Sequence, residues 1–316
     1  MGNAVDLEKM REMAESGDAL AQTLLGAVCA KGIGGKQDFE QAMKWYRLAA
    51  DQGDVVAMFN IGQMFFAGEG VIQDYREALT WFRRSALHGN SNAQLRLGNI
   101  YLSGKGAEKD LKEAVHWFQM AADNGEEKAQ IAVAQMLEKG EGTPRDLQSA
   151  AYRYRQAAGQ GNIQARLRYG KMLYNGEGVE KNFEEAIRFF TLVAEQGVVE
   201  ANQLLGLMHA RGEGVKQDYV LAAKFYRKAA DYGDLTAQLM LGSFFSKGLG
   251  VTKDVVQAHA WFNLAAARGF VMGEISAAHC RDELAGQMTI QQIEMAQILA
   301  RDLQTLVSKH LEKKTS

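Results

Sequence analysis

Seven pairs of glycines, each separated by one residue, are the first residues in this chain whose type and spacing could do chemistry. A glycine-rich loop that binds a nucleotide phosphate is used once per nucleotide, follows a β-strand and usually carries a Lys-Ser/Thr step or a third spaced glycine. Here no strand pattern precedes the pairs, and consecutive pairs are always 36 residues apart. We therefore expect an architectural role for the glycines. The pairs are Gly32/Gly34, Gly68/Gly70, Gly104/Gly106, Gly140/Gly142, Gly176/Gly178, Gly212/Gly214 and Gly248/Gly250.

The histidines and cysteines show no spacing that is typical of catalysis or metal binding. The sequence contains neither HxxxH, HExxH nor CxxC. His279 and Cys280 are adjacent, but neighbours on a helix point about 100° apart and cannot readily act as a nucleophile and its base. Cys29 is in register with Phe65 of the next copy, so we expect a small buried apolar residue and no disulfide with Cys280. We expect no enzyme, no cofactor and no metal site.

Charge and hydropathy exclude two further classes of partner. The net charge is −2, which gives no global field to attract nucleic acid or an anionic membrane. No run of 18 apolar residues predicts a membrane-spanning helix. The compartment stays open: cytoplasmic, or periplasmic or secreted if a signal peptide has been removed. The oligomeric state also stays open, with a monomer preferred.

The 36-residue period predicts two short helices per copy. The first runs from about Ala21 to just before Gly32, and its Leu25–Gly26 pair recurs along the chain. A glycine inside a helix costs about 1 kcal/mol relative to alanine, so we expect the missing side chain to let another helix approach closely. Gly32 suits a left-handed helix C-terminus. The recurring pairs are Ile61–Gly62, Leu97–Gly98, Tyr169–Gly170, Leu205–Gly206 and Leu241–Gly242.

The second helix has its own start signal and its own buried face. Asp38 and its counterparts can accept hydrogen bonds from the free N–H groups of the first turn, and Asn182 replaces the aspartate in the fifth copy. An alanine follows four residues later, and an aromatic pair follows three and four residues after that, as in Ala42 and Trp45–Tyr46. This spacing places small and large side chains on one helical face. We expect that face to be the core of the repeat.

These features together resemble the Sel-1-like repeat, a relative of the tetratricopeptide repeat with a longer connecting loop. The match covers about Gly17 to Gly269. The resemblance implies an all-α fold, a right-handed α-solenoid of antiparallel helix pairs. Departures from the pattern gather in the fourth copy, where Ala134, Thr143 and Arg153 replace the helix glycine, the loop valine and the tryptophan. Drift and a functional surface both stay open as explanations.

Three segments follow from the repeat boundaries: a capping helix in residues 1–16, seven repeats in residues 17–269, and capping helices in residues 270–316. The segment from Asp6 to Gly17 aligns with the second helix of a preceding unit. Beyond Gly269 we expect a helix over 271–285 and then, after a Thr289-to-Gln292 capping box, a helix to about His310. Such caps cover the apolar ends of a solenoid.

The concave face of the first helices is the predicted binding surface, since related repeats bind peptides or partner loops there. Amides along this face could bond an extended peptide backbone, because each offers a donor and an acceptor. Apolar residues would anchor a partner. The alternative, that Phe66 and Tyr174 lie in the core, stays open. We expect the loop acids, such as Glu177 and Glu213, to be solvated. The predicted contact residues are Gln63, Phe66, Asn99, Leu102, Gln135, Lys139, Lys171, Tyr174 and Arg211.

The leading hypothesis for function is a non-enzymatic scaffold or adaptor that binds a partner protein or peptide in this groove. The resemblance implies such roles, mostly in bacteria. A narrower alternative is a dedicated inhibitor or immunity protein that occludes a secreted enzyme or toxin. A third is a structural element that self-assembles through its ends.

Overall fold

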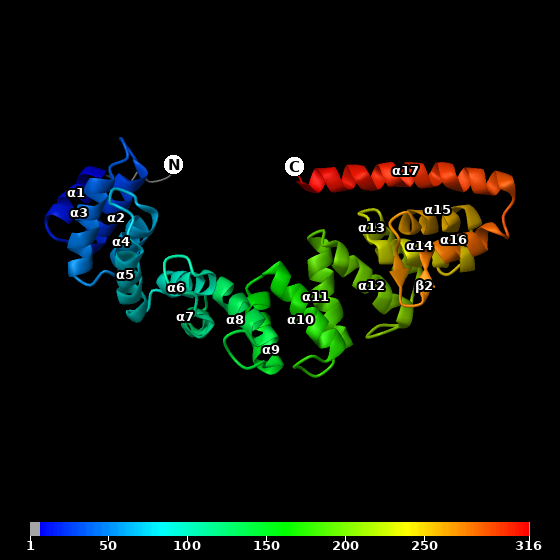
Figure 1. Ribbon diagram of the computed structural model, residues 1–316, viewed down its shortest axis with the longest axis horizontal. Helices are drawn as coiled ribbons and strands as arrows, with labels where there is room; N and C mark the ends of the chain where they lie inside the picture. Colours follow the sequence, from blue (N-terminus) through cyan, green and yellow to red (C-terminus); the bar gives the residue numbers. More distant parts are fainter. Residues whose placement is uncertain (1–6, 316) are drawn as a thin grey trace. The chain divides into compact units, whose positions relative to one another are not determined.

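The computed structural model describes residues 7–315, with side chains to residue 312, and forms an all-α solenoid of antiparallel helix pairs (Figure 1). This confirms the predicted solenoid class. Within these residues there are 17 helices and two short strands. The predicted helix start at Asp6 lies outside the described residues. The chain divides between Gln160 and Gly161 into two compact units, and each is considered by itself.

Unit 1 comprises α1 and four helix pairs. In every pair the first helix contacts its own second helix and the second helix of the preceding pair. The bounds are α1 (Leu7–Glu15), α2 (Ala19–Lys31), α3 (Phe39–Asp51), α4 (Val55–Ala67), α5 (Tyr75–Leu87), α6 (Ser91–Ser103), α7 (Leu111–Asp123), α8 (Glu127–Lys139) and α9 (Leu147–Gly159).

Unit 2 comprises three further pairs and a divergent end. The bounds are α10 (Ile163–Asn175), α11 (Phe183–Glu195), α12 (Val199–Arg211), α13 (Tyr219–Ala230), α14 (Leu235–Lys247), α15 (Val255–Ala266), β1 (Val271–Met272), β2 (Ile275–Ser276), α16 (Ala277–Ala285) and α17 (Ile290–Thr315). The helices α2, α4, α6, α8, α10, α12 and α14 are called first helices below. Their partners α3, α5, α7, α9, α11, α13 and α15 are called second helices.

The helix termini form where the sequence predicts them. Asp38 accepts a hydrogen bond from the backbone N–H of Gln41 at 2.9 Å, and Asn182 accepts one from Glu185 at the same distance. Gly32 ends α2 in the left-handed region with φ 67°. The first helices also have caps, which the sequence analysis missed: Asp18, Asp54, Asn90, Asn162 and Asp234 each accept a hydrogen bond from a first-turn N–H. Hydrogen bonds from the first-turn N–H groups thus hold the loops against the helix ends.

An aromatic ring on the second helix lies directly on the glycine of the first helix. A Cβ atom at Gly98 would lie 2.4 Å from Cδ1 of Phe118, and one at Gly26 would lie 2.7 Å from Cδ1 of Tyr46. Real Cβ atoms do not approach that closely, so only glycine fits beneath these rings. Phe118 is fully buried. The predicted close approach is confirmed, and its partner is the second residue of each aromatic pair.

Buried glutamines join consecutive pairs. Gln94 on α6 donates to the Ala86 carbonyl of α5 at 3.0 Å, and its own carbonyl accepts from Asn124 after α7 at 2.9 Å. Gln22 and Gln130 make the same two kinds of hydrogen bond in their repeats. A buried amide that lacked these partners would cost about 1–3 kcal/mol. The glutamines therefore fix the stacking of one pair on the next.

The fourth repeat compensates internally for its departures from the pattern. Ala134 is buried where other repeats have glycine, and the facing Tyr154 donates from its hydroxyl to Glu138 at 2.9 Å. Arg153 is only 9 % exposed and forms an ion pair with Asp123 of α7 at 2.5 Å. A polar contact between repeats thus replaces the tryptophan packing, which favours a structural explanation for the Arg153 departure.

The end of unit 2 differs from the prediction. The helix expected over 271–285 is wrong in its first six residues, which form an antiparallel hairpin that pairs Met272 with Ile275. The physical reason is the two-residue turn at Gly273 and Glu274, since glycine adopts φ 60° there and such a turn matches the twist of a hairpin. The capping box is confirmed: Thr289 and Gln292 exchange hydrogen bonds of 2.9 and 3.2 Å.

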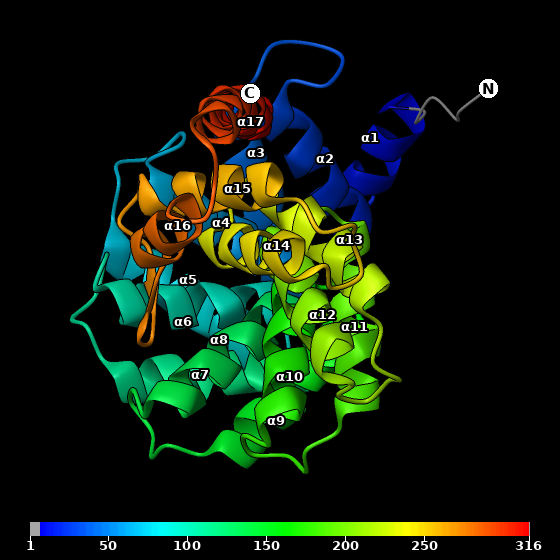
Figure 2. The ribbon, with the colours of Figure 1, turned by 90° about the vertical axis from the view of Figure 1, so that its right-hand side faces the viewer.

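Helix α17 continues beyond the predicted end at His310 and packs against α15 (Figures 1 and 2). Its buried face carries Ala300, Leu303 and Val307, which join the core formed by α13, α14 and α15. His310 stacks on Tyr232 with ring centroids 4.7 Å apart. The long helix therefore covers apolar surface on the last two second helices.

The glycine–aromatic contact predicts the effect of a substitution. Gly98→Leu must displace Phe118 from the core of unit 1, so we expect a loss of at least about 2 kcal/mol in the free energy of unfolding. The control is Gly159→Leu, because a Cβ there meets no atom within 4 Å. Urea denaturation of the full chain measures both. Equal stability of the two variants would contradict the packing account.

The Arg153–Asp123 pair predicts an energetic coupling between the third and fourth repeats. The aspartate side chain is 57 % exposed, so solvent screening limits the coupling to about 1 kcal/mol. A double-mutant cycle with Arg153→Met and Asp123→Asn, followed by urea denaturation, measures it. We expect the coupling to fall at high salt. Additive effects of the two substitutions would show that the pair does not stabilise the stack.

Candidate functional site

Three amide side chains occupy the same position on successive first helices of unit 1. Gln63 on α4 is half-buried, and Asn99 on α6 and Gln135 on α8 are exposed. Asn99 donates to the Leu95 carbonyl of its own helix at 3.0 Å. Neither Gln63 nor Gln135 forms a side-chain hydrogen bond to any residue that the structure describes. These three residues, called the amide row below, contrast with the buried glutamines, whose amides bond neighbouring helices.

Phe66 and Leu102 lie one turn further along α4 and α6, and both are half-buried. The Phe66 ring packs against Tyr75 of α5, with centroids 5.0 Å apart. The cationic groups of Arg96 and Lys105 lie 5.4 and 5.6 Å from the centre of the same ring. Phe66 therefore contributes to the core of its repeat and also to a surface where an aromatic ring meets two cations.

In unit 2 the predicted contact residues are already bonded within the chain. Lys171 on α10 forms an ion pair with Glu200 in the first turn of α12 at 2.5 Å. Tyr174 donates from its hydroxyl to Glu213 at 2.8 Å, and Arg211 lies 3.6 Å from the other oxygen of that carboxylate. Burial and the hydrogen bond to Glu213 both raise the pKa of Tyr174. The structure thus brings Tyr174 and Arg211 together through one acid.

The loop acids correct a prediction. Glu213 was expected to be solvated, yet its side chain is 24 % exposed and bonded to two neighbours. Glu177 forms an ion pair with Arg168 at 2.7 Å. In unit 1, Lys139 pairs more loosely with Glu141 at 3.9 Å. The reason is that these loop acids lie within reach of polar side chains of first helices, Arg168 and Tyr174 on α10 and Arg211 on α12.

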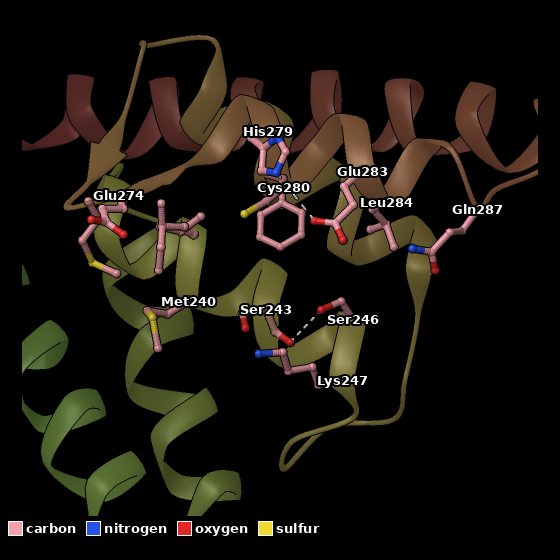
Figure 3. Close-up of a pocket in the computed structure, with 14 residues that line it drawn as sticks. Met240, Ser243, Ser246, Lys247, Glu274, His279, Cys280, Glu283, Leu284 and Gln287 are labelled. Carbon is pink, nitrogen blue, oxygen red and sulfur yellow. Dashed lines mark hydrogen bonds and ion pairs between the residues drawn. The ribbon is translucent and has the colours of Figure 1, made fainter.

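Unit 2 also contains a pocket that the sequence analysis missed. It has a volume of about 490 Å³ and lies between α14, α15, the hairpin and α16 (Figure 3). Leu239, Phe262 and Leu284 form apolar walls. Figure 3 shows Ser243, Ser246 and Lys247 of α14 opposite His279, Cys280 and Glu283 of α16. Residues of the hairpin form part of the lining of the pocket. The Gly-Glu turn at Gly273 was therefore the sequence signal from which the pocket could have been predicted.

The adjacent His279 and Cys280 do not form a nucleophile and base. The Nε2 atom of His279 lies 4.0 Å from a carboxylate oxygen of Glu283. Burial of the Cys280 thiol raises its pKa, which disfavours the reactive thiolate. Cys29 also has a free thiol, and burial raises its pKa as well. The lining of the pocket offers apolar walls and charged side chains to a bound molecule.

No group of three or more His, Cys, Asp and Glu side chains in residues 7–315 is placed to hold a metal ion. No helix of the described chain has the length and apolar character needed to cross a membrane.

Comparison with known proteins identifies a family model and several related structures. The model of the Sel1 repeat matches seven consecutive segments, residues 19–54, 55–90, 91–126, 127–162, 163–198, 199–234 and 235–270. A Sel1 repeat protein from Oxalobacter formigenes is 32 % identical, over 88 % of this chain and 79 % of that chain, with a TM-score of 0.54. No curated protein sequence matches.

Two other solved structures are similar to this chain in fold. One is described as a protective antigen present in uropathogenic Escherichia coli strains and displaying an SLR fold; it is 24 % identical, over 98 % of this chain and 97 % of that chain, with a TM-score of 0.49. The other is an immunity protein from Pseudomonas aeruginosa, 21 % identical over 67 % of this chain and 81 % of that chain, with a TM-score of 0.34.

Proposed function

This chain belongs to the Sel1 repeat family, whose members generally mediate protein–protein interaction, and we propose that it is a non-enzymatic scaffold that binds a partner protein through the first helices of unit 1. The observation that carries the proposal is the amide row. Gln63, Asn99 and Gln135 repeat once per helix pair and bond no other helix of the described chain. Gln63 and Gln135 offer their amide donors and acceptors to a partner, and Asn99 offers its amide oxygen and its second N–H.

The spacing of the amide row suits an extended peptide. Packed helices lie about 10 Å apart. We infer a similar step between successive first helices, which both contact the second helix between them. A polyproline II segment repeats every three residues and rises about 3.1 Å per residue, which brings an equivalent backbone group to each amide. Each amide can then bond one peptide N–H or C=O group. We infer that the partner presents an extended segment of about nine residues along α4, α6 and α8.

The apolar and charged residues beside the row add specificity. Phe66 and Leu102 give apolar contact area, and the cations over Phe66 favour a partner segment that carries acidic residues. Lys139 extends this charge at the end of α8. In unit 2, the side chains of Lys171 and Tyr174 are already bonded to Glu200 and Glu213, and Arg211 lies 3.6 Å from Glu213. Unit 1 is therefore the proposed primary contact.

The proposal predicts that removing the amides abolishes partner binding without unfolding the chain. Each lost hydrogen bond costs about 0.5–1.5 kcal/mol, so Gln63→Ala/Asn99→Ala/Gln135→Ala should lower partner recovery about 10-fold or more. The measurement is affinity capture from lysate and envelope fractions of the source cell, with quantification by mass spectrometry. The control is Gln41→Ala/Gln148→Ala, which removes exposed amides from second helices of the same unit.

The identity of the captured protein separates the narrower roles. One stoichiometric secreted enzyme or toxin would identify a dedicated inhibitor, and several proteins of one complex would identify an adaptor. Capture of further copies of this chain alone would instead support self-assembly. Equal recovery by the wild type and the triple variant would contradict binding through the amide row.

A further inference from the structure

The pocket in unit 2 lies where the repeat is interrupted. Adding one period of 36 residues to α14 (Leu235–Lys247) places an eighth first helix at 271–283. The first six residues of that range form the hairpin, and α16 begins only at Ala277. About one and a half helical turns are therefore missing beside α14. The pocket opens at this position.

One earlier repeat shows a charged contact beside this face. On α10, Lys171 forms its 2.5 Å ion pair with Glu200, which belongs to the first turn of the next first helix, α12. Two periods later the residue equivalent to Lys171 is Ser243, which lines the pocket. In that repeat a helical turn that carries an acid lies beside this part of a first helix.

The cation at the rim of the pocket has no loop acid beside it. Lys139 and Arg211 each pair with a glutamate two residues further on, in the loop. The equivalent cation at the end of α14 is Lys247, but Leu249 replaces the loop acid. Among the described residues no carboxylate lies within ion-pair distance of Lys247. The ammonium group is therefore available to an acid from another molecule.

The walls of the pocket require an apolar occupant. Leu239, Phe262 and Leu284 are buried in the core between α14, α15 and α16, and Met240, Met272 and Ile275 extend this surface towards solvent. The lining also holds two acids: Glu283, with a carboxylate oxygen 4.0 Å from Nε2 of His279, and Glu274 at the hairpin turn. A volume of about 490 Å³ accommodates one or two large side chains.

We propose that this pocket binds a short helix of a partner protein, which places a large apolar side chain against Phe262 and a carboxylate against Lys247. The partner helix takes the position of the missing turns of the eighth first helix. The inference rests on the proposed function, because both require a protein partner. It adds a second contact site in unit 2, with a ligand chemistry different from that of the amide row.

The test uses a phage-displayed library of 16-residue peptides selected on the full chain. Counter-selection on Ser243→Trp, which fills the pocket, removes peptides that bind elsewhere. We expect the enriched peptides to share a bulky apolar residue and an Asp or Glu one helical turn away. No enrichment, or enrichment without the acidic residue, would overturn the proposal.

Substitutions at the rim test the charge contact with a synthetic copy of an enriched peptide. Fluorescence polarisation should show about 10-fold weaker binding to Lys247→Glu, and an unchanged Kd for Lys216→Glu, an exposed lysine of the same unit outside the pocket. Because Lys247 is exposed, its substitution leaves folding intact. Equal affinity for the wild type and Lys247→Glu would overturn the proposal.

The Cys280 thiol reports on the location of the peptide. In a Cys29→Ser background Cys280 is the single cysteine, and its alkylation by iodoacetamide should slow about 10-fold when peptide saturates the chain. An unchanged alkylation rate would place the peptide outside the pocket. A cellular partner that is lost with the amide-row variant but retained by Ser243→Trp and Lys247→Glu would overturn this inference and leave the proposed function standing.

Discussion

The contact between an aromatic ring and a helix glycine is the constraint on which the rest of the fold depends. In six repeats the ring lies so close to the first helix that a Cβ atom would meet it at 2.4–2.7 Å. This contact sets the separation of the two helices in each pair and fixes which face of each helix is buried. Buried glutamines then join one pair to the next. Aspartate caps and left-handed loop glycines also recur, and the exposed side chains outside these sets differ between repeats.

The sequence alone predicts the helices of each repeat and part of their capping. The 36-residue period identified the helices, the Asp38-type caps and the left-handed glycines, because each of these depends on residues close together in the chain. The glutamine contacts were missed, since their partners lie 8 and 30 residues away on other helices. The hairpin at 271–276 was missed because the repeat pattern was extended over a Gly-Glu turn that favours strands.

The candidate sites lie where the repeated pattern changes. Unit 1 presents amides that bond no other helix, whereas the equivalent region of unit 2 is occupied by the bonds of Lys171 and Tyr174. This difference could not be read from the sequence, because a lysine or tyrosine on an exposed helix face looks the same whether or not an acid lies opposite. The half-buried side chain of Phe66 has two roles. Its ring packs against Tyr75 in the core of its repeat and also contacts the cationic group of Arg96 at the surface.

Hydrogen–deuterium exchange of the chain, alone and with its captured partner, tests the central claim that the first helices of unit 1 form the binding surface. The account predicts slower exchange in α4, α6 and α8 and unchanged exchange in the second helices α5 and α7, because the partner covers one side of each pair. Slower exchange confined to the second helices, or no change anywhere in unit 1, would contradict it.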